Sequence, residues 1–284
     1  MVYIMTRILL NNIYYLTGYG VKDGFIFIEN SIIKDLGSEP PIEYDLSDLI
    51  YDFGSKALAL HGFSVAVTPS LYFIKKAGIK DPSTLSKEGL ETSIKACLYE
   101  LLLNGVVFPI IYEEKYIDVV INIAKSLAID LGIIVTPAIE NYINNLLSYK
   151  NFFLISVHEG KDYARNVIKE EEICSLDSVS PECKILYLSE TLNMGSIILF
   201  VSKKLGSLEK TVSLLTEPYE LFNIGKGFIE KGERADLLVY DASKLPKAPF
   251  NKKYPPDIIL KGYSPDLVFI KGDIAVEKGI NYII

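Results

Sequence analysis

The first sixty residues alternate apolar and polar positions with a period of two, and turn residues interrupt them. This alternation is typical of β-strands that bury one face. The expected strands cover residues 7–11, 14–17, 25–29, 31–36 and 57–60. A β-rich stretch of this size is too small to hold a core of its own, so it must pack on the rest of the chain.

Beyond this stretch the apolar period changes to 3.6, and helices alternate with short apolar runs. Ser86 can cap a helix that ends at Gly105, and the run VVFPII follows at once. The next helix should end at Gly132, before the run IIVTP. Helices are also expected at residues 139–147 and 162–171, with the apolar runs FFLISV and KILYLS after them. Continuous apolar strands separated by helices indicate a parallel sheet buried on both faces.

The number of βα repeats sets the expected architecture. About five or six units fit between residues 64 and 222, whereas a closed barrel needs eight and about 250 residues. We therefore predict an α/β protein with a TIM-like (β/α) barrel, shortened or incomplete, over residues 61–223. Short strands return in DLLVYD, DLVFIKG and IAVEKG, so residues 1–60 and 224–284 should form one composite β-sandwich module.

This organisation and several motifs resemble the amidohydrolase superfamily, which includes dihydroorotases, cytosine deaminases and chlorohydrolases. ILLNNIYYLTG, IFIENSIIKDLG and YDFGSKALALHGF resemble the family's opening segments. GKGFIEKGERADLLVYD resembles its closing pattern G-x-I-x-x-G-x-x-A-D-L-V-V-x-D, and PDLVFIKGDIAVEKG resembles its final strand pair. The resemblance covers most of the chain and implies the fold of a metal-dependent barrel hydrolase.

The resemblance also implies a metal site, whose ligands this chain lacks. The family holds one or two divalent ions, zinc or another metal, with a His-x-His pair on the first barrel strand, later His residues and an Asp. Gly62 and Phe63 match the motif before that strand, which places Val67 and Pro69 at the His positions. YLSETLNMGSIILF, where the last ligand belongs, contains no Asp. We therefore predict that the protein binds no metal and no other cofactor.

One histidine and two acids remain as candidates for chemistry. His158 ends the run FFLISV, and with Glu159 it resembles the family's I-x-H-x-x-E ligand motif. Polar residues at the carboxyl end of a barrel strand usually face the site, so His158, Glu159 and Glu190 are the candidate pocket residues. His158 is equally consistent with a structural role, and Glu190 with a solvated loop acid. The other histidine, His61, is expected to be a loop or partly buried structural residue.

Charge and composition limit the kinds of partner that the protein is expected to bind. The net charge is −7 and no basic block occurs, which argues against nucleic acid. Every apolar run is shorter than the ~18 residues that a membrane span needs. The N-terminal MVYIMTRILLNN lacks the pattern of a signal peptide, so a cytoplasmic protein is expected. Abundant Ile and Lys with few Arg and no Trp is typical of an AT-rich thermophile.

Five further polar or reactive residues receive structural predictions. Cys97 falls at a core position of a helix. Cys174 and Cys183 can bridge a loop, but in the cytosol we expect them to be reduced. Glu113 and Glu114 stand at a helix start and are expected to be surface charge.

The missing ligands favour a degenerate amidohydrolase without metal-dependent hydrolysis, acting as a binding or regulatory protein or as a subunit beside an active paralogue. Two enzymatic alternatives stay open. One is a metal-independent hydrolase of C–N bonds in a cyclic amide or an amine-bearing ring, with His158 as general base and Glu159 or Glu190 as its partner. The other is a metal hydrolase with unrecognised ligands. A small-molecule ligand fits all three, and a shortened barrel predicts a homo-oligomer or a paralogue partner that covers apolar surface.

Overall fold

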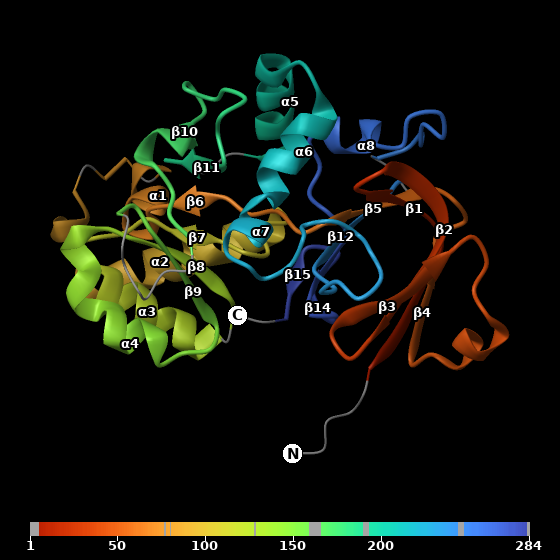
Figure 1. The fold of residues 1–284 in the computed structure, drawn as a ribbon, viewed down its shortest axis with the longest axis horizontal. Helices are drawn as coiled ribbons and strands as arrows, with labels where there is room; N and C mark the ends of the chain where they lie inside the picture. The colour runs from red at the N-terminus through yellow and green to blue at the C-terminus, as the bar shows by residue number, and fades with distance from the viewer. Residues whose placement is uncertain are drawn as a thin grey trace.

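Two sheets form the protein, one at each end of the molecule (Figure 1). The computed structural model describes residues 6–76, 78–79, 81–127, 129–158, 166–189, 193–243 and 247–282. A nine-stranded sheet combines the red and blue segments of Figure 1, and a six-stranded parallel sheet with most of the helices forms the other end. No helix in these ranges is both long enough and apolar enough to cross a membrane.

The nine-stranded sheet takes its strands from both ends of the chain. Its N-terminal strands are β1 (Arg7–Thr17), β2 (Gly20–Glu29), β3 (Ile32–Gly37), β4 (Leu49–Asp52) and β5 (Ala57–His61). Its C-terminal strands are β12 (Leu237–Asp241), β13 (Leu267–Ile270), β14 (Asp273–Glu277) and β15 (Ile280–Asn281). The two sets join where β5 pairs antiparallel with β12, with Ala59 opposite Val239. The strands from the two ends of the chain are therefore hydrogen-bonded into one sheet, and β3 at its edge bonds back to residues 232–233, before β12. Its description as a composite β-sandwich module stays a prediction.

The first strand shows how a bulge keeps one face of this sheet apolar. Residues 7–17 form a single strand, not the two that the sequence predicted, and its pairing with β2 shifts between Leu10 and Ile13. Asn12, at the shift, has a positive φ of 51°. Because the bulge adds one residue, Leu10 and Ile13 point to the same side although three positions separate them. Both therefore belong to one core cluster, together with Tyr15.

The parallel sheet has the strand order β10-β11-β6-β7-β8-β9. Its strands are β6 (Ala66–Val67), β7 (Ile110–Ile111), β8 (Leu131–Val135), β9 (Phe152–Ser156), β10 (Ile173–Ser175) and β11 (Ile185–Leu188). All five neighbouring pairs are parallel. The described strands do not close into a barrel, and β9 and β10 form the two edges. This agrees with the expectation of an incomplete barrel.

Eight α-helices occur in the described ranges: α1 (Pro69–Lys76), α2 (Lys87–Leu103), α3 (Ile117–Leu127), α4 (Ile143–Leu147), α5 (Met194–Leu205), α6 (Leu208–Thr216), α7 (Pro218–Leu221) and α8 (Asp257–Leu260). Four 3-10 turns add Ile42–Leu46, Pro82–Thr84, Pro137–Tyr142 and Glu170–Glu172. The predicted N-cap of α2 is confirmed, because the Ser86 side chain accepts a hydrogen bond from the Gly89 N–H. Its predicted end is confirmed as well, since Gly105, just after the cap Asn104, has a φ of +86°.

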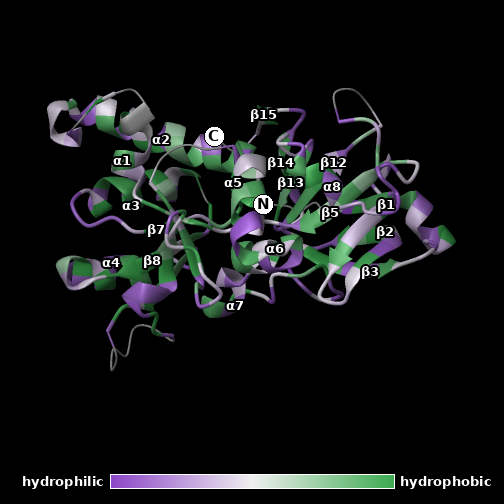
Figure 2. Cartoon of the chain, turned by 90° about the horizontal axis from the view of Figure 1, so that it is seen from above, coloured by the Kyte–Doolittle hydropathy of each residue, from purple (hydrophilic) through white to green (hydrophobic). Residues whose placement is uncertain are grey.

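The parallel sheet buries a different set of side chains on each face. One face, called here the helical face, packs against α2, α3, α5 and α6 through Val67, Ile133 and Leu188, among others. The opposite face, called here the inner face, carries Ala66 and Ile110 and packs against α7 and the residue after it. In Figure 2 the strands are mostly hydrophobic, whereas the peripheral loops are more hydrophilic. The two faces account for the continuous apolar runs in the sequence.

Two predicted elements are wrong. Gly132 lies inside β8 and does not end a helix, because α3 stops at Leu127. A Cβ atom at Gly132 would stand 2.9 Å from the Phe222 ring and 3.1 Å from the Phe108 ring, so aromatic packing on the inner face explains the glycine. The helix expected at 162–171 lies partly outside the described residues. In the described remainder, Val167 pairs with Ser156 and only a 3-10 turn follows.

A buried charge network joins the two sheets. Asp130, just before β8, accepts hydrogen bonds from Arg234 Nη1 at 2.5 Å and from Lys271 Nζ at 2.7 Å. Asp236, just before β12, accepts from Arg234 Nε at 2.6 Å and from the Lys271 backbone N–H at 2.7 Å. Asp130 and Asp236 are buried. The parallel sheet thus contributes one carboxylate, and the nine-stranded sheet contributes the cations.

Candidate functional site at the carboxyl ends of the parallel strands

The carboxyl ends of parallel strands meet at one edge of their sheet, and α/β proteins bind ligands at that edge. In this chain the parallel strands end at that edge with Val67, Ile111, Val135, Ser156, Ser175 and Leu188. The side chains that follow these strand ends define the candidate site.

The first strand places different residues in the site from those that the sequence analysis named. Val67 packs on the helical face, and Pro69 is the first residue of α1. Ala66 faces inward, and Thr68 donates a hydrogen bond to the Tyr112 carbonyl at 2.7 Å. Successive side chains of a strand point to opposite faces of the sheet. A shift of one residue in the alignment therefore exchanges the inward-facing side chains for the outward-facing ones. Ala66 and Thr68, not Val67 and Pro69, therefore occupy the inward positions.

Hydroxyl groups dominate the inward side of this edge. The Tyr187 hydroxyl lies 3.0 Å from Thr68 Oγ1, and since that Thr hydroxyl donates to a carbonyl, Tyr187 donates to it. The Tyr112 ring packs edge-on against the Tyr187 ring, with centroids 6.1 Å apart. Burial raises the pKa of Tyr112, and the charges of Glu170 and Glu114 raise it further, so its hydroxyl stays protonated. These groups form a neutral hydrogen-bonding surface.

The two acids after β7 have different environments. Glu113 is 4% exposed, which makes its prediction as surface charge wrong, whereas Glu114 is exposed. The Glu113 oxygens accept hydrogen bonds from the Ser70 and Tyr116 N–H groups, each at 3.3 Å. A carboxylate that accepts N–H groups at helix starts is well compensated. Glu113 therefore ties β7 to the first turns of α1 and α3. Glu114 accepts a hydrogen bond from Thr136 Oγ1 at 2.7 Å.

The candidate His158 lies just beyond β9 and is exposed. Its backbone N–H donates to Ser156 Oγ at 3.0 Å, and its neighbour Val157 packs on the inner face. Glu159 and Glu190 lie outside the described residues. The roles of these three residues therefore stay predictions.

His61 has a structural environment at the junction with the other sheet. It is 3% exposed at the end of β5, opposite Leu237 of β12. Its ring packs edge-on against Tyr219 at a centroid distance of 4.3 Å, and Nδ1 lies 3.1 Å from the Gly62 carbonyl. Burial lowers its pKa, against the opposing effect of the Asp236 charge. His61 belongs to the core and not to the candidate site.

The donor set at the edge does not fit a catalytic zinc ion. Zinc takes nitrogen, sulfur or carboxylate ligands, and a catalytic ion needs three of them from the protein. The inward residues Ala66, Thr68, Tyr112 and Tyr187 offer a methyl group and neutral hydroxyls. Within the described ranges, no group of three or more His, Cys, Asp or Glu residues is placed to hold a metal ion.

A pocket of about 370 Å³ lies beside Tyr187, between the ends of β10 and β11 and helix α5. Its lining is Ser175, Leu176, Asp177, Tyr187, Leu188, Ser189, Ser196, Ile197 and Phe200. We call it the rim pocket. These residues carry no signal in the sequence, because the wall combines a loop, two strand ends and a helix that no sequence motif connects.

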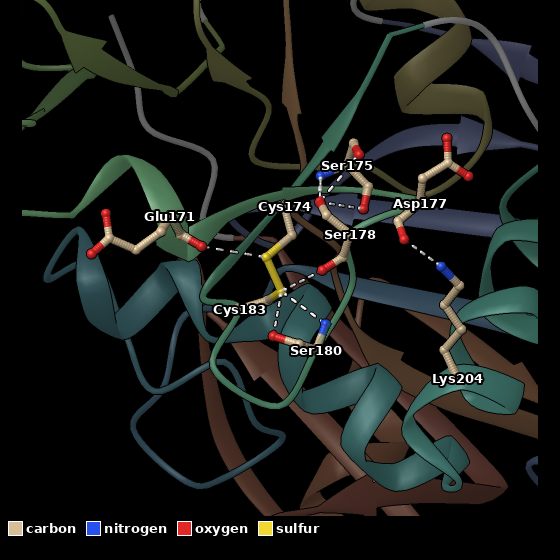
Figure 3. Close-up of a disulfide and its surroundings, with 8 residues drawn as sticks. All are labelled: Glu171, Cys174, Ser175, Asp177, Ser178, Ser180, Cys183 and Lys204. Atoms are coloured by element: carbon tan, nitrogen blue, oxygen red, sulfur yellow. Dashed lines mark hydrogen bonds between the residues drawn. A yellow bond between two sulfur atoms is a disulfide. The ribbon is translucent and has the colours of Figure 1, made fainter.

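A disulfide between Cys174 and Cys183 closes the loop that forms part of this wall (Figure 3). The prediction that both thiols are reduced is therefore wrong for this structure. Cys174 lies in β10, and Cys183 lies two residues before the neighbouring strand β11. Pairing of these strands brings the two Cα atoms to 5.8 Å, the usual separation for a disulfide. Cys97 is a free thiol buried in α2, as predicted.

No protein-family model and no curated protein matches this sequence. Solved structures do match. A triazine hydrolase from Arthrobacter aurescens has a TM-score of 0.72 at 13% identity, covering 98% of this chain and 96% of that one. A zinc-bound atrazine chlorohydrolase from the same organism has a TM-score of 0.69 at 11% identity, covering 98% and 97%. A zinc-bound adenosine deaminase from Xanthomonas campestris has a TM-score of 0.65 at 10% identity, covering 98% and 95%.

These structural neighbours are enzymes of the amidohydrolase superfamily. At such low identity the likeness concerns the fold. This chain therefore shares with them a mixed α/β fold built on a parallel sheet, although its own described strands form no closed barrel.

Proposed function

We propose that this protein is an amidohydrolase-like binding protein that does not carry out metal-dependent hydrolysis. The chemistry of the inward side chains supports the proposal. Ala66, Thr68, Tyr112 and Tyr187 occupy the edge where a hydrolase of this fold would need nitrogen or carboxylate ligands. The protein would then act by binding, either alone in a regulatory role or as a subunit beside an active paralogue.

The rim pocket is suited to a small planar ring that carries N–H donors. Phe200 can stack on a ring, while Leu188 and Ile197 contact its apolar parts. Asp177 and the serine hydroxyls can accept hydrogen bonds from its amino groups. Two structural neighbours are named for such nitrogen-rich ring compounds, atrazine and adenosine.

Isothermal titration with adenosine, atrazine and benzamidine tests the binding role. Benzamidine is a planar ring with a cationic N–H donor group, and benzoate is its anionic counterpart of the same shape. Benzamidine should bind and benzoate should not, because Asp177 repels a carboxylate. Asp177→Asn should weaken benzamidine binding about fivefold or more. Asp23→Asn is the matched control, an exposed acid on β2 of the other sheet, and should leave binding unchanged. Binding of none of the three compounds would argue against this pocket as the site.

Elemental analysis of protein purified without chelator tests the second half of the proposal. A site without three ligands cannot hold zinc tightly, so we expect well under one equivalent of zinc, manganese or iron per chain. EDTA should leave the melting temperature unchanged, since a metal that does not bind cannot stabilise the fold. About one tightly held ion per chain would overturn the proposal.

The alternative is an active hydrolase of C–N bonds. It is favoured by the structural neighbours, which include hydrolases and a deaminase. Ammonia release from adenosine, with and without added zinc, tests this alternative. Release without zinc that His158→Ala abolishes would support a metal-independent enzyme with this histidine as general base. Release that depends on zinc would support a metal hydrolase whose ligands lie partly in undescribed residues.

A further inference from the structure

We propose that the Cys174–Cys183 disulfide is a redox switch for the rim pocket. In the oxidised protein the loop of residues 175–182 forms one wall of the pocket, and reduction of the disulfide by a dithiol releases that wall. The switch rests on the proposed binding function for its biological meaning, but the loop movement itself is measurable without any ligand.

The loop contributes to two cavities at once. Ser175, Leu176 and Asp177, immediately after Cys174, line the rim pocket. Ser180, Pro181 and Cys183, at the other end of the loop, line a second cavity of about 390 Å³ beside α6. Figure 3 shows the disulfide between these two ends. The conformation of this loop therefore decides the shape of the rim pocket.

Few other interactions hold the loop in place. Ser178 N–H donates to the Ser175 carbonyl at 3.1 Å, and Cys183 N–H donates to the Ser180 carbonyl at 3.2 Å, so both bonds stay within the loop. Residues 176–182 also accept two hydrogen bonds from neighbouring elements, from the Ser175 N–H of β10 to Ser178 Oγ at 3.0 Å and from Lys204 Nζ of α5 to the Asp177 carbonyl at 2.6 Å. Leu176 and Val179 are partly buried and pack against the core on the helical face. The disulfide adds a covalent cross-link between the two ends of the loop to these few contacts.

The second cavity gives a reductant a route to the disulfide. Cys174 and Cys183 are 3% and 5% exposed, so a thiol needs a path to one of them. Cys183 lines the second cavity, whose charged groups are Lys210, Glu209 and Glu217, so a neutral dithiol enters it more easily than an anionic one. The Cys183 sulfur also accepts the Ser180 N–H at 3.1 Å, a contact that stabilises a thiolate on this residue.

Reduction then follows ordinary thiol–disulfide exchange. One thiolate of the dithiol attacks Cys183 Sγ and forms a mixed disulfide, while the Cys174–Cys183 bond breaks and Cys174 leaves as a thiolate that takes up a proton. The second thiolate of the dithiol attacks its own sulfur in the mixed disulfide. Cys183 leaves as a thiolate and is protonated in turn. The products are two cysteine thiols and the dithiol in its cyclic disulfide form.

Hydrogen–deuterium exchange tests the switch without a ligand. The comparison uses the Cys97→Ala variant, in which no third thiol can exchange, before and after reduction with dithiothreitol. Amides of residues 175–183 should exchange at least tenfold faster after reduction, whereas amides of β12 and β13 should not change. Cys174→Ser/Cys183→Ser in the same background should match the reduced protein. A change of less than twofold in the exchange rates of residues 175–183 would overturn the proposal. If the double variant does not fold, the comparison of oxidised with reduced wild-type protein tests the same expectation.

Benzamidine titration adds a readout at the pocket. Reduction should weaken benzamidine binding about tenfold, and by linkage saturating benzamidine should slow reduction of the oxidised protein. Equal affinity for both redox forms would overturn the switch while leaving the binding function intact. If benzamidine binds neither form, the proposed binding function fails, and the exchange experiment still decides whether the loop responds to reduction.

Discussion

Replacing Asp130 by asparagine tests whether the buried charge network holds the two sheets together. Asp130 is 1% exposed, and its carboxylate accepts hydrogen bonds from Arg234 and Lys271 of the other sheet. Asparagine has almost the same shape but no charge, and its NH₂ group would face one of these donors. The substitution therefore leaves two cations at the junction without their shared anion.

The expected loss follows from the partners that remain. Removing one member of a buried ion pair costs about 3–5 kcal/mol. Arg234 keeps Asp236, which accepts from its Nε at 2.6 Å, and the Lys271 side chain is 37% exposed. We therefore expect the lower end, about 3 kcal/mol. With an unfolding entropy of about 2.1 cal/mol/K per residue, a chain of 284 residues should lose about 5 °C in melting temperature.

Chemical and thermal unfolding followed by circular dichroism measure this loss. Asp35→Asn is the matched control, because Asp35 pairs with Lys231 at 3.2 Å on the surface of the nine-stranded sheet. A surface pair contributes less than about 1 kcal/mol, so the control should change little. The reasoning would be refuted if Asp130→Asn destabilised the protein no more than Asp35→Asn.

Three further variants test other parts of the structure. Burial lowers the pKa of His61, so the folded protein takes up a proton there less readily than the unfolded chain, whose His pKa is about 6.5. The free energy of unfolding should therefore be highest above this pH and fall below it. In urea unfolding at pH 5, 6 and 7, His61→Gln should reduce this dependence of the unfolding free energy on pH. Cys174→Ser/Cys183→Ser opens a covalent ring of about ten residues, since the cysteines are nine positions apart in the sequence. The double variant should lose about 2.7 kcal/mol of unfolding free energy. A double variant as stable as the oxidised protein would contradict this. Gly132→Ala should lower the unfolding free energy by about 1–2 kcal/mol in the same assay, because its Cβ would stand 2.9 Å from the Phe222 ring. A stabilised variant would show that the inner face can accommodate a methyl group at this position.

Local patterns in the sequence determined most of the elements. Ser86 and Gly105 delimit α2 correctly, because a cap and a positive φ depend on residues close in the chain. The apolar runs at β8, β9 and β11 predicted buried strands, since a parallel sheet covered on both faces needs apolar side chains at every position. The motifs at the two ends of the chain resembled those of the amidohydrolases, and the structural neighbours belong to that superfamily.

The candidate site depended on facts that the sequence does not contain. Val67 was named at a ligand position, yet the register of β6 directs Thr68 inward, and register depends on the neighbouring strands. Glu113 looked like surface charge because its N–H partners at Ser70 and Tyr116 become neighbours only when α1 and α3 pack beside β7. A sequence pattern carries no information about which distant groups will face a side chain.

Tertiary structure alone decided the roles of Gly132 and of the two cysteines in the loop. Gly132 has the sequence context of a helix stop, but rings from Phe108 and Phe222, far apart in the chain, leave no space for a side chain there. Cys174 and Cys183 are nine residues apart in the sequence in either redox state. Only the pairing of β10 with β11 brings their Cα atoms to 5.8 Å, a separation that a disulfide can bridge. Periodicity reports how a segment divides its side chains between core and solvent, whereas close packing and covalent pairing depend on segments that meet only in the folded chain.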